Sequence, residues 1–360
     1  MSDPIHIVVL PGDGIGSEVT ASALQVMEAA SRRFNVNLAW EEHAFGGAAL
    51  DEAGVAFPEE TRAACLSADA ILLGAIGGPA WDSTTPSKRP EAGLLALRQA
   101  LDAYANLRPV RVPDVLAHLS VLPPDRVGGT DMLVVRELTG GIYFGEPRQY
   151  SEEEAFDTMR YSASEVDRIA RIAFEQARSR SGRVTSVDKA NVLASSRLWR
   201  ERVSRLHAEA YPDVSLDHMY VDNAAMQIVR EPRAFDVVLT ANLFGDILSD
   251  LASSLAGSLG VLPSASLGGF SPLFEPVHGS APDIAGRGEA NPVAAILSGA
   301  MLLESVDQHG AANLIRQAVD NILTRGIMTL DLSSNGVSTS EFTTRVCEAI
   351  AQADVVPSTT

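Results

Sequence analysis

Residues 5–16 of the chain read IHIVVLPGDGIG, which is an apolar run followed directly by a glycine-rich turn. A short apolar run bounded by turn residues is typical of a buried strand, so we expect a strand over Ile5–Leu10. Beyond the turn, apolar residues recur at the spacing of a helix, at Val19, Ala23, Met27, Ala30 and Phe34. The chain therefore opens with a strand–turn–helix unit, the building block of α/β folds.

The same alternation continues along the chain. Apolar runs predict further strands at Ala70–Leu73, Met132–Val135, Val184–Val187, Val214–Val221 and Val237–Thr240. Helical periodicity predicts helices at Leu94–Tyr104, Glu165–Ser179, Leu198–Ala210, Leu243–Leu255, Val293–Val306 and Ala311–Leu323. Strands that alternate with helices predict a layered α/β fold.

Several segments break this pattern. Leu138–Tyr161 holds glycines, a proline and aromatic residues without a helical period, which predicts a hairpin or protruding arm. Pro263–Gly269 and Gly286–Asn291 have the composition of loops. The last residues, Val355–Thr360, are expected to form a loose tail.

The glycine turn does not match the fingerprint of a classical dinucleotide site. That fingerprint is G-x-G-x-x-G, and Ser17 stands where its last glycine belongs. The acidic residue expected about 20 positions later is also missing, because that stretch reads Arg32-Arg33-Phe34. The glycines fit a tight strand–helix turn, and the helix N-terminus beyond it can still approach a cofactor.

Composition limits the partners of the chain. Its 360 residues carry a net charge of −18, which disfavours nucleic acid and also repels an anionic substrate unless local arginines or a cation reverse the field. Only two cysteines occur, no basic stretch precedes Ile5–Leu10, and no apolar run approaches the ~20 residues of a membrane span. These features favour a cytoplasmic protein.

Three arginines lie beside apolar segments where a charge needs a partner. They are Arg98, on a leucine-rich helix, Arg108, within NLRP at 106–109, and Arg136, at the end of an apolar strand. Guanidinium groups bind carboxylates through two parallel hydrogen bonds, so together they could hold a dicarboxylate. Structural salt bridges and exposed side chains are the alternative for each arginine alone.

Two aspartates, Asp246 and Asp250, follow one another at i and i+4 in NLFGDILSD. This spacing puts both carboxylates on one face of an apolar helix, where they can ligate a hard cation such as Mg²⁺ or Mn²⁺. Asp222, expected at the end of another strand, could supply a third ligand. The alternative is that one aspartate caps the helix and the other faces water.

Two residues are candidates for proton transfer. Lys189 follows the predicted strand Val184–Val187, and the carboxyl ends of strands are where open α/β sheets place their sites. It could act as a base if its surroundings lower its pKa. Tyr143, in the predicted arm, has a proton to donate. A surface lysine and a packing aromatic are the alternatives.

A second loop, EPVHGSAPD at 275–283, has small residues that let the backbone approach a ligand. Asp283 could accept hydrogen bonds from ribose hydroxyls and would repel a 2′-phosphate, which favours NAD over NADP. A structural loop in which Ser280 caps a helix is the alternative.

Together these segments resemble the isocitrate/isopropylmalate dehydrogenase family of β-decarboxylating dehydrogenases. The resemblance runs over nearly the whole chain, from LPGDGIG at 10–16 to the loop Glu275–Asn291. EAGLLALR at 91–98, NLRP and RELTGGIYFG at 136–145 look like that family's substrate motifs. VDKANV at 187–192 and NLFGDILSD at 242–250 look like its catalytic and metal motifs.

The resemblance implies a two-domain fold with its own cofactor site rather than a classical Rossmann fold. It implies a cofactor-side domain built from 1–103 and 257–360, and a second domain, 104–256, that holds the dimer interface and the arm at about 138–161. It also implies a homodimer with shared active sites, in which Lys189 and Asp222 come from the neighbouring subunit.

The family's chemistry implies a role for each matching residue. Lys189 and Tyr143 are the expected base and acid, and Asp222, Asp246 and Asp250 the expected ligands of Mg²⁺ or Mn²⁺. Arg98, Arg108, Arg136 and Asp222 would bind the substrate. NAD would be bound by Ile15, Glu91, Glu275, His278, Gly279, Ser280, Ala281, Asp283 and Asn291.

Substrate choice is expected to depend on Leu94 and Leu95, since an isopropyl group needs an apolar wall. The resemblance thus implies NAD-dependent oxidative decarboxylation of 3-isopropylmalate, with a D-malate or tartrate dehydrogenase as the alternative. A sensor that binds without catalysis would have lost one of Lys189, Tyr143, Asp246 or Asp250, and all four are present.

Overall fold

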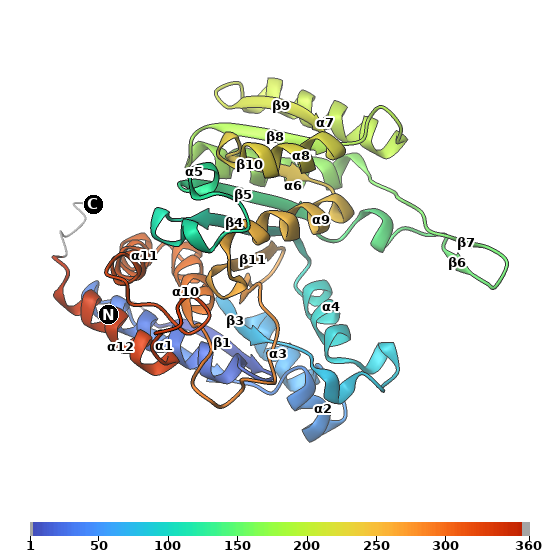
Figure 1. Ribbon diagram of the computed structural model, residues 1–360. Coiled ribbons are helices and arrows are strands. Elements are labelled where there is room, and N and C mark those ends of the chain that lie inside the picture. The colour runs from blue at the N-terminus through green and yellow to red at the C-terminus, as the bar shows by residue number, and fades with distance from the viewer. Residues whose placement is uncertain (1–2, 355–360) are drawn as a thin grey trace. The chain divides into compact units, whose positions relative to one another are not determined.

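The structure is a computed structural model that describes residues 3–354. The chain divides into two compact units, one formed by Met1–Ala103 with Ser258–Thr360 and the other by Tyr104–Gly257. Each unit is an α/β layer structure with its own stretch of sheet (Figure 1). The predicted α/β class is confirmed, and the predicted tail at Val355–Thr360 lies outside the described residues.

The sheet of the first unit follows the order β2-β1-β3-β12-β11. The strands are β1 (Ile5–Gly12), β2 (Leu38–Glu42), β3 (Ala70–Ala75), β11 (Pro263–Gly268) and β12 (Leu273–Pro276). β1 runs parallel to β2 and β3, β3 runs parallel to β12, and β11 pairs with β12 in the antiparallel sense. β3 is buried along its whole length, as expected for a central strand covered on both faces.

Helices cover both faces of this sheet. α1 (Gly16–Arg33), α10 (Val293–Ser305), α11 (His309–Thr324) and α12 (Thr339–Gln352) pack on one another, and α1 and α10 contact β3. A second apolar cluster joins Leu10 and Leu73 of the strands to Cys65 of α3 (Glu59–Ser67) and Leu97 of α4 (Pro90–Ala100). The short helix α2 (Gly47–Ala53) begins beside the end of β1.

The sheet of the second unit follows the order β4-β5-β10-β8-β9. Its strands are β4 (Ala103–Val112), β5 (Thr130–Glu137), β8 (Arg183–Asp188), β9 (Ser215–Tyr220) and β10 (Val237–Thr240). All neighbouring pairs are parallel except β4 with β5. The strands β5, β10, β8 and β9 therefore end at one common edge of the sheet.

Two pairs of helices pack on this second stretch of sheet. α6 (Ala163–Arg178) packs on α7 (Ala194–Ala210), and α8 (Val221–Arg230) packs on α9 (Asn242–Ser253). The short helix α5 (Pro124–Val127) precedes β5. The predicted arm is confirmed: β6 (Gln149–Tyr150) and β7 (Ala155–Phe156) form a two-stranded hairpin that extends from the unit (Figure 1).

Four sequence-based expectations are wrong in detail. The helix expected over Leu94–Tyr104 begins at Pro90 and ends at Ala100, and Tyr104 lies in β4. Pro263–Gly269 is mostly strand β11 rather than a loop. Val221 and Asp222 do not end a strand, because they open α8. The helix expected over Leu198–Ala210 begins earlier, at Ala194.

Other expectations hold closely. The strand at Val237–Thr240 has the predicted bounds, and the helices at Val293–Ser305 and Ala194–Ala210 end within one residue of the expected position. A search of the described helices for one that is long and apolar enough to cross a membrane finds none.

Candidate active site

Asp13, in the glycine turn after β1, joins three segments of the first unit. β1 and β3 run parallel with Gly12 opposite Ala75, so the loops that follow them lie together. The buried Asp13 carboxylate accepts hydrogen bonds from the amides of Gly47 (2.9 Å), Ala48 (2.9 Å) and Gly77 (2.8 Å). Burial raises the pKa of Asp13, and these three donors oppose the rise. Sequence reasoning missed this residue, although it lies between two glycines of the motif.

Ser280 ties the loop at 275–283 to the same turn. Its carbonyl accepts a hydrogen bond from the amide of Ile15 at 2.8 Å, and its hydroxyl donates to the carbonyl of Gly77 at 2.5 Å. A Cβ on Gly14, whose φ is +57°, would lie 2.0 Å from the Ser280 carbonyl oxygen, so this close approach requires glycine. The alternative in which Ser280 caps a helix is wrong, because no helix follows it.

The rest of this loop carries polar groups with few protein partners. His278 Nδ1 lies 2.9 Å from the Gly279 carbonyl, its Nε2 is buried without a partner among the described residues, and burial lowers its pKa. Ala281 has a φ of +39°, unusual for a residue with a side chain. Asp283 is exposed. The predicted cofactor residues of this loop therefore belong to one segment held against the glycine turn.

Asn291 is held in place by a residue that the sequence did not single out. Its Nδ2 donates to Asp331 at 3.0 Å, and its Oδ1 accepts from the amide of Val293 at 3.0 Å. Glu91 lies close to the end of β3, because a Cβ on Gly77 would be 2.4 Å from Glu91 Oε1. Glu91 and Ser280 thus both border Gly77, and Ile15 is bonded to Ser280.

Arg98 pairs with Glu275 in the first unit. Arg98 Nη2 and Glu275 Oε1 are 2.6 Å apart, and both side chains are mostly buried. Arg98 Nε is buried without a partner among the described residues. Of the two leucines on the same helix that were predicted to bind substrate, Leu94 packs against the apolar cluster and Leu95 is 56% exposed.

In the second unit, four parallel strands deliver the other predicted residues to one edge. Arg136 lies near the end of β5, opposite Thr240 at the end of β10, from which α9 starts. Lys189 directly follows β8, and Val221 separates Asp222 from the end of β9. Because adjacent parallel strands end together, residues far apart in sequence collect at this edge.

Asp246 accepts hydrogen bonds from two of the predicted site residues, Arg136 and Tyr143. Its Oδ1 accepts a hydrogen bond from Arg136 Nη1 at 2.5 Å, and its Oδ2 accepts one from the Tyr143 hydroxyl at 2.7 Å. Burial raises the pKa of Tyr143, and the bond to Asp246 raises it further. The phenol is therefore kept in its protonated form.

Asp250, one helical turn further along α9, pairs with Arg108 of β4. Arg108 Nη1 donates to Asp250 Oδ1 at 3.0 Å and to the Ser249 hydroxyl at 2.8 Å, and Arg108 Nε donates to Asn106 at 2.9 Å. Neither aspartate caps the helix, whose N-cap is Ala241, so the capping alternative is wrong. Each carboxylate instead faces its own arginine.

Lys189 and Asp222 form a separate pair. Lys189 Nζ donates to Asp222 Oδ1 at 2.7 Å, and this bond lowers the pKa of Asp222. Between residues 3 and 354, no group of three or more His, Cys, Asp or Glu side chains is arranged to hold a metal ion. The structure thus brings Asp246 and Asp250 onto one helix and gives Asp222 a different partner within the chain.

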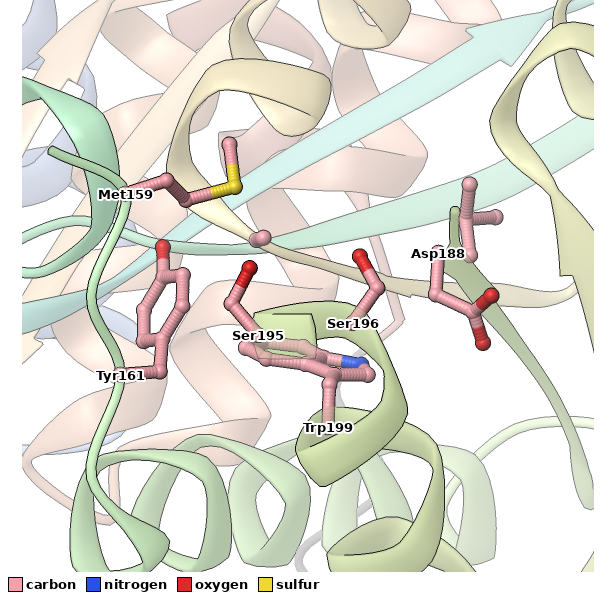
Figure 2. A pocket seen from close by; sticks show the side chains of 8 residues that line it. Met159, Tyr161, Asp188, Ser195, Ser196 and Trp199 are labelled. Carbon is pink, nitrogen blue, oxygen red and sulfur yellow. The ribbon is translucent and has the colours of Figure 1, made fainter. Parts of the chain in front are cut away.

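Asp188 and Arg200 hold the turn that carries Lys189 in place. Asp188 is buried, accepts from the amide of Ala190 at 2.8 Å, and takes two hydrogen bonds from Arg200. Figure 2 shows Asp188 on the wall of a narrow pocket that Tyr161 and Trp199 also line, and this pocket is too tight for a water molecule. Sequence reasoning missed Asp188 and Arg200 as supports, although Asp188 directly precedes the predicted base.

Guanidinium groups, paired carboxylates, a phenol and a lysine at the carboxyl edge of an α/β sheet define an enzyme that handles an anionic substrate. The profile of the isocitrate/isopropylmalate dehydrogenase family matches residues 6–346. The chain belongs to this family.

Curated relatives and solved structures agree with that assignment. The chain is 60% identical to the 3-isopropylmalate dehydrogenase of Salinibacter ruber over 98% of this chain and 96% of the relative. It is 55% identical to the enzyme of that name from Geobacillus kaustophilus, over 96% and 95%. Isocitrate dehydrogenase from Methylococcus capsulatus superposes with a TM-score of 0.83 at 35% identity, over 96% of this chain and 99% of that one. A β-decarboxylating dehydrogenase from Thermococcus kodakarensis gives 0.82 at 37%, over 96% of both.

Proposed function

We propose that the chain catalyses NAD-dependent oxidative decarboxylation of 3-isopropylmalate to 4-methyl-2-oxopentanoate and CO₂, a step of leucine biosynthesis. The observation that carries this proposal is the junction at Asp246, where a guanidinium and a protonated phenol share one carboxylate. High identity to enzymes named 3-isopropylmalate dehydrogenase over nearly the whole chain supports the substrate.

Arg98, Arg108 and Arg136 are proposed to bind the two carboxylates of the substrate. Each guanidinium is largely buried and already paired with an acid, so it is held in a fixed orientation before the substrate arrives. The buried, unpartnered Nε of Arg98 leaves a donor available for a further acceptor. Preorganised donors of this kind favour a planar anion over water.

Asp246 and Asp250 fit a divalent cation through their chemistry. Both supply hard carboxylate oxygens from one face of α9, and Asp250 is 72% exposed at its side chain. A bound Mg²⁺ or Mn²⁺ would stabilise negative charge on the 2-oxygen of the substrate. We propose Asp222 of a second chain as the third ligand, as the family resemblance implies, and it would arrive together with the Lys189 to which it is bonded.

Two side chains, a base and an acid, would each move one proton. Lys189 would accept the proton of the 2-hydroxyl while the hydride of C2 passes to NAD. After loss of CO₂ from the resulting 2-oxo acid, Tyr143 would protonate the carbon that lost it. The raised pKa of Tyr143 keeps this proton in place at neutral pH.

The loop at 275–283, the glycine turn and Asn291 are proposed to bind NAD. Ile15 and Ser280 share a backbone hydrogen bond, and Glu91 lies beside Gly77 in the same region. Gly279 is exposed and has no atom within 4 Å of a built Cβ, so the backbone there is open to a ligand. His278, Ala281, Glu275 and Asp283 complete the proposed set, with Asp283 reading the ribose.

A homodimer with shared active sites is proposed from the surface of the second unit. The packed helices α8 and α9 expose Met226 to 55% and Ile247 to 57%, and the arm exposes Tyr150 to 89%. Large apolar side chains that remain exposed on neighbouring helices indicate an interaction surface. A second copy would cover them, and it would bring in the Lys189 and Asp222 of the other chain. We propose a cytoplasmic location for this enzyme.

The substrate is tested by NADH formation with 3-isopropylmalate, isocitrate, D-malate and tartrate, each with Mn²⁺ present. We expect the highest kcat/KM for 3-isopropylmalate, with CO₂ released in equal amount to NADH. A higher kcat/KM for D-malate or tartrate would replace the proposed substrate by the alternative one. NADH without CO₂ would contradict decarboxylation.

Shared active sites are tested by mixing two inactive variants, Lys189→Ala and Asp246→Asn. If Lys189 serves the neighbouring chain, a mixed dimer has one site with both changes and one site with neither, so activity returns on mixing under exchange conditions. If each site lies within one chain, every site carries one change and the mixture stays inactive. Each variant assayed alone is the control for the mixture.

A further inference from the structure

Asn242, the first residue of α9, is fully buried and uses all the hydrogen-bonding capacity of its side chain. A side-chain amide can accept two hydrogen bonds at oxygen and donate two at nitrogen. Oδ1 accepts from Nε and Nη2 of Arg136, at 3.1 and 2.8 Å. Nδ2 donates to the carbonyls of Leu138 and Gly140, at 3.0 and 3.1 Å.

The oxygen end of Asn242 sets the plane of the Arg136 guanidinium. Two N–H groups of one guanidinium point at a single oxygen, so the group can neither rotate about its long axis nor tilt without breaking one bond. Nη1 is thereby aimed at Asp246 Oδ1, 2.5 Å away. Asn242 and Asp246 are four residues apart on α9 and therefore share a face of the helix.

The nitrogen end of Asn242 holds the turn that carries Tyr143. Leu138 and Gly140 lie between the end of β5 and the single helical turn Gly141–Tyr143. The Tyr143 hydroxyl reaches the other oxygen of Asp246 at 2.7 Å. One amide thus spans the two segments whose side chains meet at one carboxylate.

Asn242 is itself anchored through its backbone. Its amide donates to the Tyr161 hydroxyl at 2.9 Å, and that hydroxyl donates to the buried Glu137 at 3.2 Å. Tyr161 packs edge-to-face on Trp199 with ring centroids 5.4 Å apart, and Figure 2 shows both rings on the wall of the narrow pocket. The start of α9 has little freedom to move, so the side-chain amide is a rigid spacer.

We infer that Asn242 is a positioning residue that sets Arg136 and Tyr143 against the two oxygens of Asp246. The inference rests on the proposed function, because it assumes that Arg136 binds substrate and Tyr143 supplies a proton. It assigns to a neutral buried side chain the task of keeping the anion-binding group and the acid in register. A displacement of ~1 Å at a reacting group can cost about 100-fold in rate.

Two substitutions separate the two ends of the amide. Asn242→Asp keeps two acceptor positions for Arg136 but removes both donors to Leu138 and Gly140. We expect kcat to fall about 100-fold while KM for the hydroxy acid changes little. Asn242→Ser loses both ends, so both parameters should worsen. In both variants KM for NAD should stay unchanged.

Coupling to Tyr143 is measured with a double-mutant cycle. If Asn242 acts through Tyr143, Asn242→Asp in a Tyr143→Phe background should lower kcat by less than about 3-fold. Phe174→Leu, in the buried core of α6, is the structural control, since it lowers stability without touching these residues.

Additive effects in the cycle, or a loss no larger than in Phe174→Leu, would each overturn the inference. If the parent chain prefers another hydroxy acid, the same variants are compared on that acid, so the proposed substrate fails while the role of Asn242 is judged separately. If Asn242→Asp does not fold, Asn242→Ser is used in the double-mutant cycle instead.

Discussion

The hydroxyl of Tyr143 donates a 2.7 Å hydrogen bond to Oδ2 of Asp246, a residue 103 positions later in the chain. The acid that we assign to the last proton transfer is therefore bound to a carboxylate that we assign to the metal. Burial and this carboxylate both raise the pKa of the phenol. A neutral phenol beside an anion can release its proton only when a stronger base appears on the substrate.

Titration of the phenol tests this relationship. Tyr143 should ionise above pH 10, the ordinary value, because the folded surroundings favour its protonated form. The folded chain then keeps this proton to a higher pH than the unfolded chain does. The stability that the protonated phenol contributes is therefore lost as pH rises past 10. The measurement is a near-ultraviolet absorbance titration of the parent chain minus that of Tyr143→Phe. Asp246→Asn should shift the midpoint downward, and a midpoint below 10 in the parent chain would contradict the assignment.

Removing a carboxylate from α9 should weaken metal binding directly. Asp250→Asn is expected to raise the Kd for Mn²⁺ by at least about 10-fold. Even a residue that only hydrogen-bonds to a metal ligand typically changes metal affinity by about 10-fold or more when it is replaced. Calorimetry or the Mn²⁺ resonance signal measures this without turnover. Asp213→Asn is the matched control, since Asp213 is an exposed aspartate paired with Arg178 in the same unit. Equal Kd values in both variants would rule out Asp250 as a ligand, and full activity in excess chelator would rule out the metal.

Asp283 should determine the choice between the two nicotinamide cofactors. An exposed carboxylate at a ribose repels a 2′-phosphate, so Asp283→Ser should move the ratio of kcat/KM values towards NADP. Asp283→Lys should move it further, because attraction replaces repulsion. Asp307→Ser, another exposed acid of the first unit, is the control and should leave the ratio unchanged. If all three variants keep the parent ratio, the ribose is read by another residue.

Leu95 should contribute to recognition of the isopropyl group. Its side chain is 56% exposed and free to contact a ligand, whereas Leu94 packs against the core. Apolar contacts are worth ~1–3 kcal/mol per methylene, so Leu95→Ser should lower kcat/KM for 3-isopropylmalate by about 10-fold or more relative to D-malate. Steady-state kinetics with both acids measures the ratio, and exposed Val55→Ser is the control. If the ratio stays the same in Leu95→Ser, another residue contacts the isopropyl group. Leu94→Ser is expected to lower the stability of the fold instead.

Local patterns predicted the regular elements where one signal was strong. The run Val237–Thr240 consists of β-branched and apolar residues and predicted the bounds of β10, while the leucine repeat before Tyr104 predicted too long a helix. β4 and β11 were missed because polar residues and prolines, such as Asn106, Arg108 and Pro263, interrupt their apolar pattern. Arg108, for example, is paired with Ser249 and Asp250 of the distant helix α9, which no local window contains.

Candidate site residues could be predicted where a residue type was chemically out of place. A guanidinium beside an apolar strand and two aspartates at i and i+4 were visible in the sequence as groups that need partners. No local pattern pointed to Asn242 or Asp13, because a buried amide or carboxylate that is satisfied by backbone groups looks like any loop residue in the sequence. Their roles depend on distant carbonyls and amides.

The sequence by itself determined the alternation of strands with helices, the residue types able to bind an anion or a cation, and the absence of a classical dinucleotide fingerprint. Only the tertiary structure decided which arginine pairs with which aspartate. Arg136 finds Asp246 across 110 residues and Arg108 finds Asp250 across 142, because parallel strands end at one edge and a helix starts there. Periodicity is a property of neighbours along the chain, whereas a hydrogen bond of defined length between distant side chains exists only after the layers have packed.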